Sequence, residues 1–309
     1  MPIQTRRVDI KTGFVCNNNC IFCAQAHKKN LGNRTTREIK ADLKDARKRC
    51  NSVVFTGGEV TIRTDVLELI RYAKSLGFQR IQIQTNGRML SYKNFCKKII
   101  DAGANEFGPA IHGHCAEIHD SLTRAKGSFF QTISAIKNLK EEGHCVITNT
   151  VVVKQNYRHL PKLAELLVRL KVDQFQFAFV HPIGNAFVNF DKVVPRVSIV
   201  APFIKKGLQI GLDSGICVMA EAIPYCHMRG YERYVSENYI PLTEVKDYNY
   251  SDLDYRLTRV TEGKAKFRQC RQCKFERICE GAWKEYPERL GSSEFRPVRG
   301  KKISSLNEI

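Results

Sequence analysis

The sequence has no apolar run long enough to cross a bilayer, and residues 1–7 contain no apolar core of a secretory signal. No Gly-x-Gly-x-x-Gly motif follows the first predicted strand, so no Rossmann-type dinucleotide loop is expected there. The chain also has no arginine-rich tract and no low-complexity segment. These absences leave an ordinary globular protein, for which we expect a cytoplasmic location and no membrane partner.

Acidic residues are few relative to basic ones. The 309 residues include 31 Asp or Glu and 50 Lys or Arg, which gives a formal net charge of +19. This excess fits RNA, an acidic peptide, or an acidic electron donor such as flavodoxin or ferredoxin. It equally fits solvated helix faces, because the basic residues are spread over most predicted helices.

Twelve cysteines occur in a chain without a recognisable targeting segment. In a reducing compartment, cysteines in such numbers indicate metal ligation rather than a disulfide framework. The length predicts one large domain with an appendage, or two domains, and 43% hydrophobic residues provide ample material for a core. We therefore expect metal centres in a chain of one or two domains.

Short β-rich runs alternate with longer helical ones from residue 8 to about residue 180. The predicted strands are 8–15, 51–56, 80–85, 105–111, 144–153 and 173–180. Strands that each precede a helix are typical of a parallel α/β fold, although periodicity alone does not separate an open sheet from a barrel. Beyond them we expect a helix over 195–207, a strand over 208–212 and a loosely ordered polar tail.

Three cysteines follow the first predicted strand in a C-x3-C-x2-C spacing, at Cys16, Cys20 and Cys23. A compact loop of this kind can direct three thiolates to one point, which suits an iron–sulfur cluster or zinc. Three ligands leave one metal position open, and an open position is where chemistry takes place. The alternative is a zinc knuckle that takes His27 as its fourth ligand.

The cysteine loop, with Phe22 before its third cysteine, resembles the signature loop of the radical S-adenosylmethionine (radical SAM) superfamily. The resemblance implies a [4Fe–4S] cluster on the three cysteines, with SAM chelated to the fourth iron. It also implies a partial (β/α)6 TIM-like barrel whose active site lies at the carboxyl ends of the strands. Reductive cleavage of SAM would then give a 5′-deoxyadenosyl radical that abstracts a hydrogen atom from the substrate.

Further strand ends carry residues that resemble the SAM side of that family. Gly57, Gly58 and Glu59 end the second strand, where the family holds the amino group of SAM. The chain has Ala-Ile-His-Gly at the end of strand four, where the family commonly has Ser-Leu-Asp-Gly. We expect His112 to contact SAM, to contact the substrate, or to form hydrogen bonds with the polar end of the strand. The remaining residues that the resemblance places near SAM are Thr85, Asn86, Asn149 and His181. A histidine metal cluster at residues 112, 114, 119 and 181 is the alternative.

A second cysteine group has a C-x2-C-x5-C spacing in a region poor in aliphatic residues, at Cys270, Cys273 and Cys279. Such a region usually requires a metal to fold. The group resembles a shortened auxiliary [4Fe–4S] module of SPASM/twitch-type radical SAM enzymes. Of two upstream cysteines we choose Cys226 as the fourth ligand, because Cys217 lies in an apolar context typical of a buried thiol. Structural zinc is the alternative.

The expected organisation is a radical SAM partial barrel over 1–212, a small C-terminal auxiliary-cluster domain over 213–290 and a tail over 291–309. The resemblance favours a peptide or protein side chain as the substrate. The basic charge favours the alternative, radical SAM modification of RNA, a nucleotide or a small-molecule precursor. A zinc-bound nucleic-acid-binding protein is the non-enzyme alternative.

Overall fold

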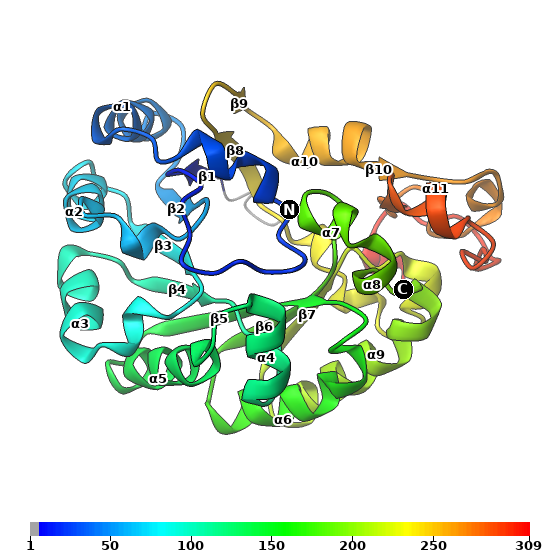
Figure 1. The fold of residues 1–309 in the computed structure, drawn as a ribbon. Coiled ribbons are helices and arrows are strands. Elements are labelled where there is room, and N and C mark those ends of the chain that lie inside the picture. Colours follow the sequence, from blue (N-terminus) through cyan, green and yellow to red (C-terminus); the bar gives the residue numbers. More distant parts are fainter. Residues whose placement is uncertain (1–5) are drawn as a thin grey trace.

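The computed structural model describes residues 6–309, so the prediction made from residues 1–7 lies almost entirely outside it. Nine strands form one sheet in the order β7-β6-β5-β4-β3-β2-β1-β8-β9, and every neighbouring pair is parallel except β8 and β9. Figure 1 shows the sheet curving inside an outer layer of helices. The parallel order confirms the predicted α/β fold. Within residues 6–309, no helix combines the length and the apolar character needed to span a membrane.

The strands of the sheet are β1 (Arg6–Lys11), β2 (Ser52–Thr56), β3 (Arg80–Thr85), β4 (Glu106–Pro109), β5 (Cys145–Val152), β6 (Gln174–Phe179), β7 (Cys217–Glu221), β8 (Leu242–Lys246) and β9 (Ser251–Asp252). The helices that alternate with them are α1 (Thr36–Ala46), α2 (Val66–Ser75), α3 (Lys93–Ala102), α4 (Ala116–Thr123), α5 (Ser128–Glu141), α6 (Leu160–Arg169) and α9 (Val197–Asp213). Shorter elements follow β6 and β9: α7 (Asn185–Val188), α8 (Phe190–Val193), α10 (Tyr255–Thr258), β10 (Lys264–Ala265), β11 (Ala282–Trp283) and α11 (Tyr286–Leu290).

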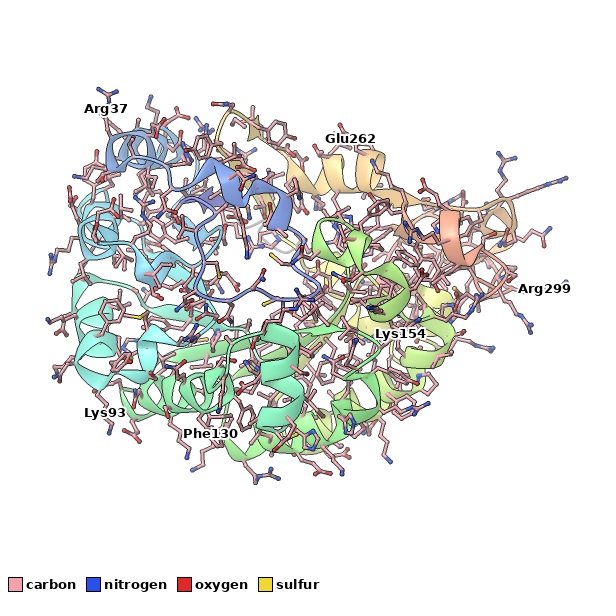
Figure 2. The ribbon with its side chains drawn as sticks, in the orientation of Figure 1. Arg37, Lys93, Phe130, Lys154, Glu262 and Arg299 are labelled. Atoms are coloured by element: carbon pink, nitrogen blue, oxygen red, sulfur yellow. The ribbon has the colours of Figure 1, made fainter. Side chains whose placement is uncertain are left out.

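Alternation along the strands separates an apolar outer layer from a polar interior. In β6 the rings of Phe175 and Phe177 are fully buried on the helical side. The intervening Gln174 and Gln176 line a cavity of about 540 Å³ inside the curved sheet. Successive side chains point to opposite faces of a strand, so each phenylalanine packs beneath the helices while each glutamine faces inward. Figure 2 shows the solvated side of this layer, where Lys93 and Phe130 project outward from α3 and α5.

All six predicted strands form, but β7, β8 and β9 were not predicted and the strand expected over 208–212 is wrong. Those residues continue α9 to Asp213. Gly207 and Gly211 are the reason, because a Cβ on either would lie 2.6 Å from a ring atom of Phe177 or Phe175. The two glycines let the helix approach β6 closely rather than ending it.

The expectation of a loosely ordered tail is also wrong. Phe295 and Ile303 are buried, and the backbone N–H of Ile303 donates to the carbonyl of Lys274 at 3.0 Å. The tail therefore packs on the segment that carries the second cysteine group. That segment is tied to the barrel by buried Arg259, whose guanidinium meets the carboxylates of Glu221, Glu237 and Glu280.

Candidate functional site

A cavity of about 220 Å³ opens where the loops after β1, β2, β3 and β4 meet. These loops meet because the carboxyl ends of parallel strands lie along one edge of a sheet. The predicted site residues that line the cavity are Cys16, Cys20, Cys23, Gly57, Gly58, Glu59, Thr85, Asn86 and His112. Residues separated by nearly a hundred positions in the chain are thus brought to one site.

The two glycines after β2 bring their backbone against the start of the cysteine loop. The N–H of Gly58 donates to the carbonyl of Gly13 at 2.7 Å, and that of Glu59 to the carbonyl of Val15 at 2.9 Å. A Cβ on Gly58 would lie 2.2 Å from the Val15 oxygen, and Gly57 has a φ of +130°. Any side chain at these positions would separate the second strand end from the loop.

Glu59 is a buried carboxylate held by four donors. Its Oε1 accepts from the backbone N–H and hydroxyl of Thr61 and from the hydroxyl of Thr85, and its Oε2 accepts from the N–H of Asn86. Burial raises the pKa of the carboxyl, and the hydrogen bonds from Asn86, Thr61 and Thr85 oppose that rise. The fixed carboxylate faces the cavity, where it can accept from an ammonium group.

His112 is held in one tautomer. Its Nδ1 accepts from the backbone N–H of Val151 at 3.2 Å, so the ring proton is on Nε2. The backbone N–H of His112 donates to Nδ1 of the His119 ring at 3.1 Å. Burial lowers the pKa of His112 well below its usual value, so the ring is neutral near pH 7. Phe22 packs edge-on against it at 4.8 Å and does not itself line the cavity.

Asn149 and His181 do not line this cavity, and their expected contacts with SAM stay predictions. Asn149 lines the interior of the barrel. The ring of His181 stacks on Trp283 at 3.7 Å, and its Nε2 lies 3.4 Å from the carboxylate of Glu285. The loop after β6 therefore contacts the C-terminal segment through His181. The four histidines of the alternative metal site do not converge either, since His114 stacks on His159.

The cysteine loop is clamped by residues that the sequence did not single out. Nη1 of Arg88 donates to the carbonyl of Asn17 and, at 3.1 Å, to the amide oxygen of Asn18. On the other side, Asn185 donates from Nδ2 to the carbonyl of Cys20 and from its backbone N–H to that of Cys23. Arg88 directly follows Asn86-Gly87 at the end of β3, and this position is the feature of the sequence that could have identified Arg88 as a site residue.

The three thiols of the loop are partly buried beside one cavity. Burial raises the pKa of Cys16 and Cys23 and raises that of Cys20 to about 12, so without a metal they stay protonated near pH 7. The buried Oε1 of Gln25, in the same cavity, has no hydrogen-bond partner within residues 6–309. Three cysteine sulfurs beside a buried carboxylate and an unpartnered amide oxygen fit a [4Fe–4S] cluster with SAM beside it. In the described chain no three His, Cys, Asp or Glu side chains converge as ligands of a single ion.

The structure brings Cys226 together with the later cysteine group and leaves Cys217 apart. Cys226, Cys270, Cys273 and Cys279 line one apolar pocket, whereas Cys217 is exposed on β7. Burial raises the pKa of Cys226, and the other three cysteines add to that rise. The backbone N–H groups of Phe267 and Val298 lie 3.4 Å from the sulfurs of Cys270 and Cys273, respectively.

Arg88→Ala removes the two hydrogen bonds that the Arg88 guanidinium donates to Asn17 and Asn18 of the cysteine loop. We expect reconstituted protein with this substitution to lose iron to a chelator several times faster than the wild type, because the loop loses charge-assisted hydrogen bonds. Absorbance at the iron–sulfur charge-transfer band measures the loss. Arg37→Ala, on the outer surface in Figure 2, is the control. Equal rates for all three proteins would show that Arg88 does not hold the loop.

Curated relatives match a little over half of the chain. An AdoMet-dependent heme synthase of Oleidesulfovibrio alaskensis is 32% identical over 174 residues, which are 55% of this chain and 44% of that protein. A probable GTP 3′,8-cyclase of Saccharolobus solfataricus is 30% identical over 186 residues, 59% of each. The chain thus spans about half the length of these relatives.

Solved structures share the fold over nearly the whole chain. Streptococcus suis SuiB bound to the precursor peptide SuiA has a TM-score of 0.65 at 15% identity and covers 96% of this chain and 76% of its own. The enzyme anSMEcpe with bound AdoMet and Cp18Cys peptide has a TM-score of 0.67 at 15% identity and covers 97% of this chain and 93% of its own. The Radical SAM superfamily model matches residues 10–167, from β1 through most of α6. The chain is an enzyme of the radical SAM superfamily.

Proposed function

We propose that this enzyme cleaves SAM reductively and uses the radical to abstract hydrogen from a peptide or protein side chain, with an auxiliary cluster in a SPASM/twitch-like C-terminal module. The observation that carries the proposal is the cavity that unites the three-cysteine loop, the Gly57-Gly58-Glu59 turn and the end of β3. Membership of an enzyme superfamily argues against the non-enzyme alternative of a zinc-bound nucleic-acid-binding protein.

The residues of the cavity have separate roles in this proposal. Cys16, Cys20 and Cys23 would hold the [4Fe–4S] cluster, which supplies the electron for reductive cleavage of SAM. Glu59 accepts from the ammonium group of SAM, and its four donors keep the carboxylate from rotating away. His112 donates from Nε2 to an acceptor on SAM or on the substrate. Phe22 holds the His112 ring from the side.

The second cysteine group would hold an auxiliary [4Fe–4S] cluster. Cys226, Cys270, Cys273 and Cys279 can fill all four iron positions, which leaves no iron open for substrate. Electron transfer or structural support is therefore the role we assign. We place the enzyme in the cytoplasm, where flavodoxin or ferredoxin would supply the electron to a chain of net charge +19.

The peptide substrate is supported by the likeness of the whole chain to SuiB and anSMEcpe, whose structures hold peptides. The likeness to SuiB extends over 96% of this chain, whereas the heme synthase matches 55% of it. A small molecule or nucleotide is the second candidate, because two of the curated relatives are named as heme synthase and GTP 3′,8-cyclase. RNA belongs to this second class of candidate substrates, because the basic charge of the chain favours binding to nucleic acid.

Hydrogen abstraction provides the test, because it moves a substrate hydrogen into 5′-deoxyadenosine. Reconstituted enzyme is incubated with SAM, dithionite and a uniformly deuterated cell extract separated into protein and peptide, RNA and small-molecule fractions. We expect deuterium in 5′-deoxyadenosine only with the protein and peptide fraction. Deuterium from the RNA or small-molecule fraction would instead establish the second candidate, and no 5′-deoxyadenosine from any mixture would contradict both. Unlabelled extract is the control.

A further inference from the structure

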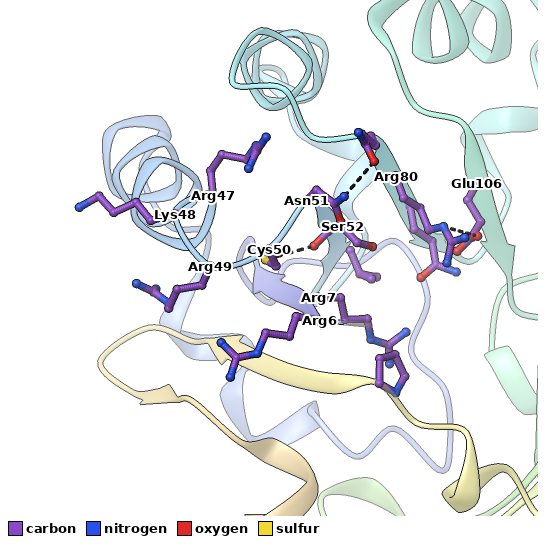
Figure 3. Close-up of a pocket in the computed structure, with 14 residues that line it drawn as sticks. Arg6, Arg7, Arg47, Lys48, Arg49, Cys50, Asn51, Ser52, Arg80 and Glu106 are labelled. Carbon is purple, nitrogen blue, oxygen red and sulfur yellow. Dashed lines mark hydrogen bonds and ion pairs between the residues drawn. The ribbon is translucent and has the colours of Figure 1, made fainter. Parts of the chain in front are cut away.

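A basic pocket of about 750 Å³ lies at the amino-terminal ends of β1, β2, β3 and β4 (Figure 3). It opens at the end of the sheet opposite the cysteine loop, beside the chain that leaves α1. We call it the basic mouth. Its basic lining residues are Arg6, Arg7, Arg47, Lys48, Arg49 and Arg80, and its acidic lining residue is Glu106.

Several guanidinium groups of the basic mouth retain donors. Within residues 6–309, the Arg6 guanidinium makes no hydrogen bond or ion pair, and the Arg47 guanidinium donates from Nε to the carbonyl of Leu76 and lies over the Phe78 ring. Arg80 meets Glu106 at 3.5 Å, and its side chain is 64% exposed. Arg49 differs, because the carboxylates of Asp45 and Glu244 hold it. Guanidinium groups that retain N–H donors can bind phosphate oxygens.

Gln82 adds an acceptor at the inner end of the basic mouth. Its side chain is 4% exposed, and its Oε1 has no hydrogen-bond partner within the described chain. A buried amide oxygen without a donor costs free energy that a ligand hydroxyl or amino group would recover. The residue lines both the basic mouth and the polar barrel interior. A phosphate with a hydrogen-bond donor attached is therefore the ligand that these side chains fit.

The basic mouth is separate from the site of SAM chemistry. Arg80 begins β3 and Thr85, which lines the cysteine cavity, ends it. Six residues of strand span about 20 Å, so a phosphate at Arg80 lies far from the reacting atoms. The volume of about 750 Å³ is within the range of small-molecule sites.

We propose that the basic mouth binds the phosphate groups of a nucleotide, either free or at the end of an RNA strand. The phosphates lie among Arg6, Arg47 and Arg80, and a hydroxyl or amino group of the nucleotide donates to Gln82. The site does not depend on which substrate the radical attacks.

The test measures binding to the full-length, cluster-containing enzyme without SAM. Tripolyphosphate and ATP are titrated by calorimetry, and a fluorescent single-stranded RNA by anisotropy. We expect Arg6→Gln with Arg80→Gln to weaken all observed binding by about tenfold or more, because two charge-assisted contacts are lost. Arg37→Gln with Arg169→Gln removes the same charge from exposed positions outside the basic mouth and is expected to leave binding unchanged. Unchanged release of 5′-deoxyadenosine shows that each variant is folded.

A third variant separates the phosphate from the rest of the ligand. Gln82→Met is expected to weaken ATP or RNA several-fold and to leave tripolyphosphate unchanged. Tighter binding of ATP than of RNA identifies a free nucleotide. Tighter binding of RNA, with competition by tripolyphosphate, identifies an RNA end. Absence of binding by wild type, or equal weakening by the control double variant, would overturn the proposal while leaving the proposed radical chemistry intact.

Discussion

Replacing Cys16, Cys20 and Cys23 together by alanine abolishes the release of 5′-deoxyadenosine from SAM under dithionite. The same variant retains about four of the about eight irons expected for two [4Fe–4S] clusters. The reason is local, since all three thiols line one cavity with Glu59 and no other cysteine lines it. Anaerobic iron determination and chromatography of the products measure the two effects.

The matched control carries alanine at Cys115, Cys145 and Cys217, which removes three thiols that line neither cysteine pocket. It is expected to keep both the iron and the product. Undiminished 5′-deoxyadenosine from the loop variant would show that SAM is cleaved elsewhere. Stoichiometric zinc in wild-type protein, reconstituted with iron and sulfide, would contradict the cluster assignment itself.

The cysteine loop and the turn after β2 could be predicted because their information is local. Their function depends on spacing within a few residues, and each directly follows a strand with a clear apolar pattern. The parallel order of the sheet then brings the carboxyl ends of neighbouring strands together. The resemblance to the radical SAM superfamily pointed to Thr85, Asn86 and His112, and all three line the cavity.

Residues whose places depend on distant packing could not be predicted. β8 pairs with β1, more than 230 positions earlier in the chain, and its five residues carry no periodic signal strong enough to identify it. His181 follows β6 as expected, but stacking on Trp283 from the C-terminal segment decides where its ring lies. Asn149 faces the barrel interior because of the pairing between β5 and β6.

Local sequence context predicted the surroundings of Cys226 but not those of Cys217. An aliphatic-poor neighbourhood pointed to Cys226, and this cysteine lies with Cys270, Cys273 and Cys279 around one pocket. Cys217 was expected to be buried, yet it is exposed at the start of the edge strand β7. Its apolar neighbours reflect the strand that contains it, since Val218 and Ala220 are buried on alternate positions.

Cys226→Ala is expected to lower the iron content from about eight toward about four, while Cys217→Ala leaves it unchanged. Each substitution removes one sulfur atom, so a difference in iron content between the two variants depends only on where the lost cysteine lies. The N–H groups that approach Cys270 and Cys273 belong to Phe267 and to the tail residue Val298. Loss of the auxiliary cluster should therefore also loosen the tail, which limited proteolysis beyond residue 291 detects.

The same pair of variants separates the two cysteine sites by function. Cys226→Ala retains the three-cysteine loop, so release of 5′-deoxyadenosine under dithionite should persist near the wild-type rate. If the auxiliary cluster carries an electron away from the substrate radical, transfer of deuterium into 5′-deoxyadenosine should continue while the modified product falls at least about tenfold. Product formation at the wild-type rate would leave the cluster with a structural role. Full iron content in Cys226→Ala, with loss in Cys217→Ala, would instead reverse the ligand assignment.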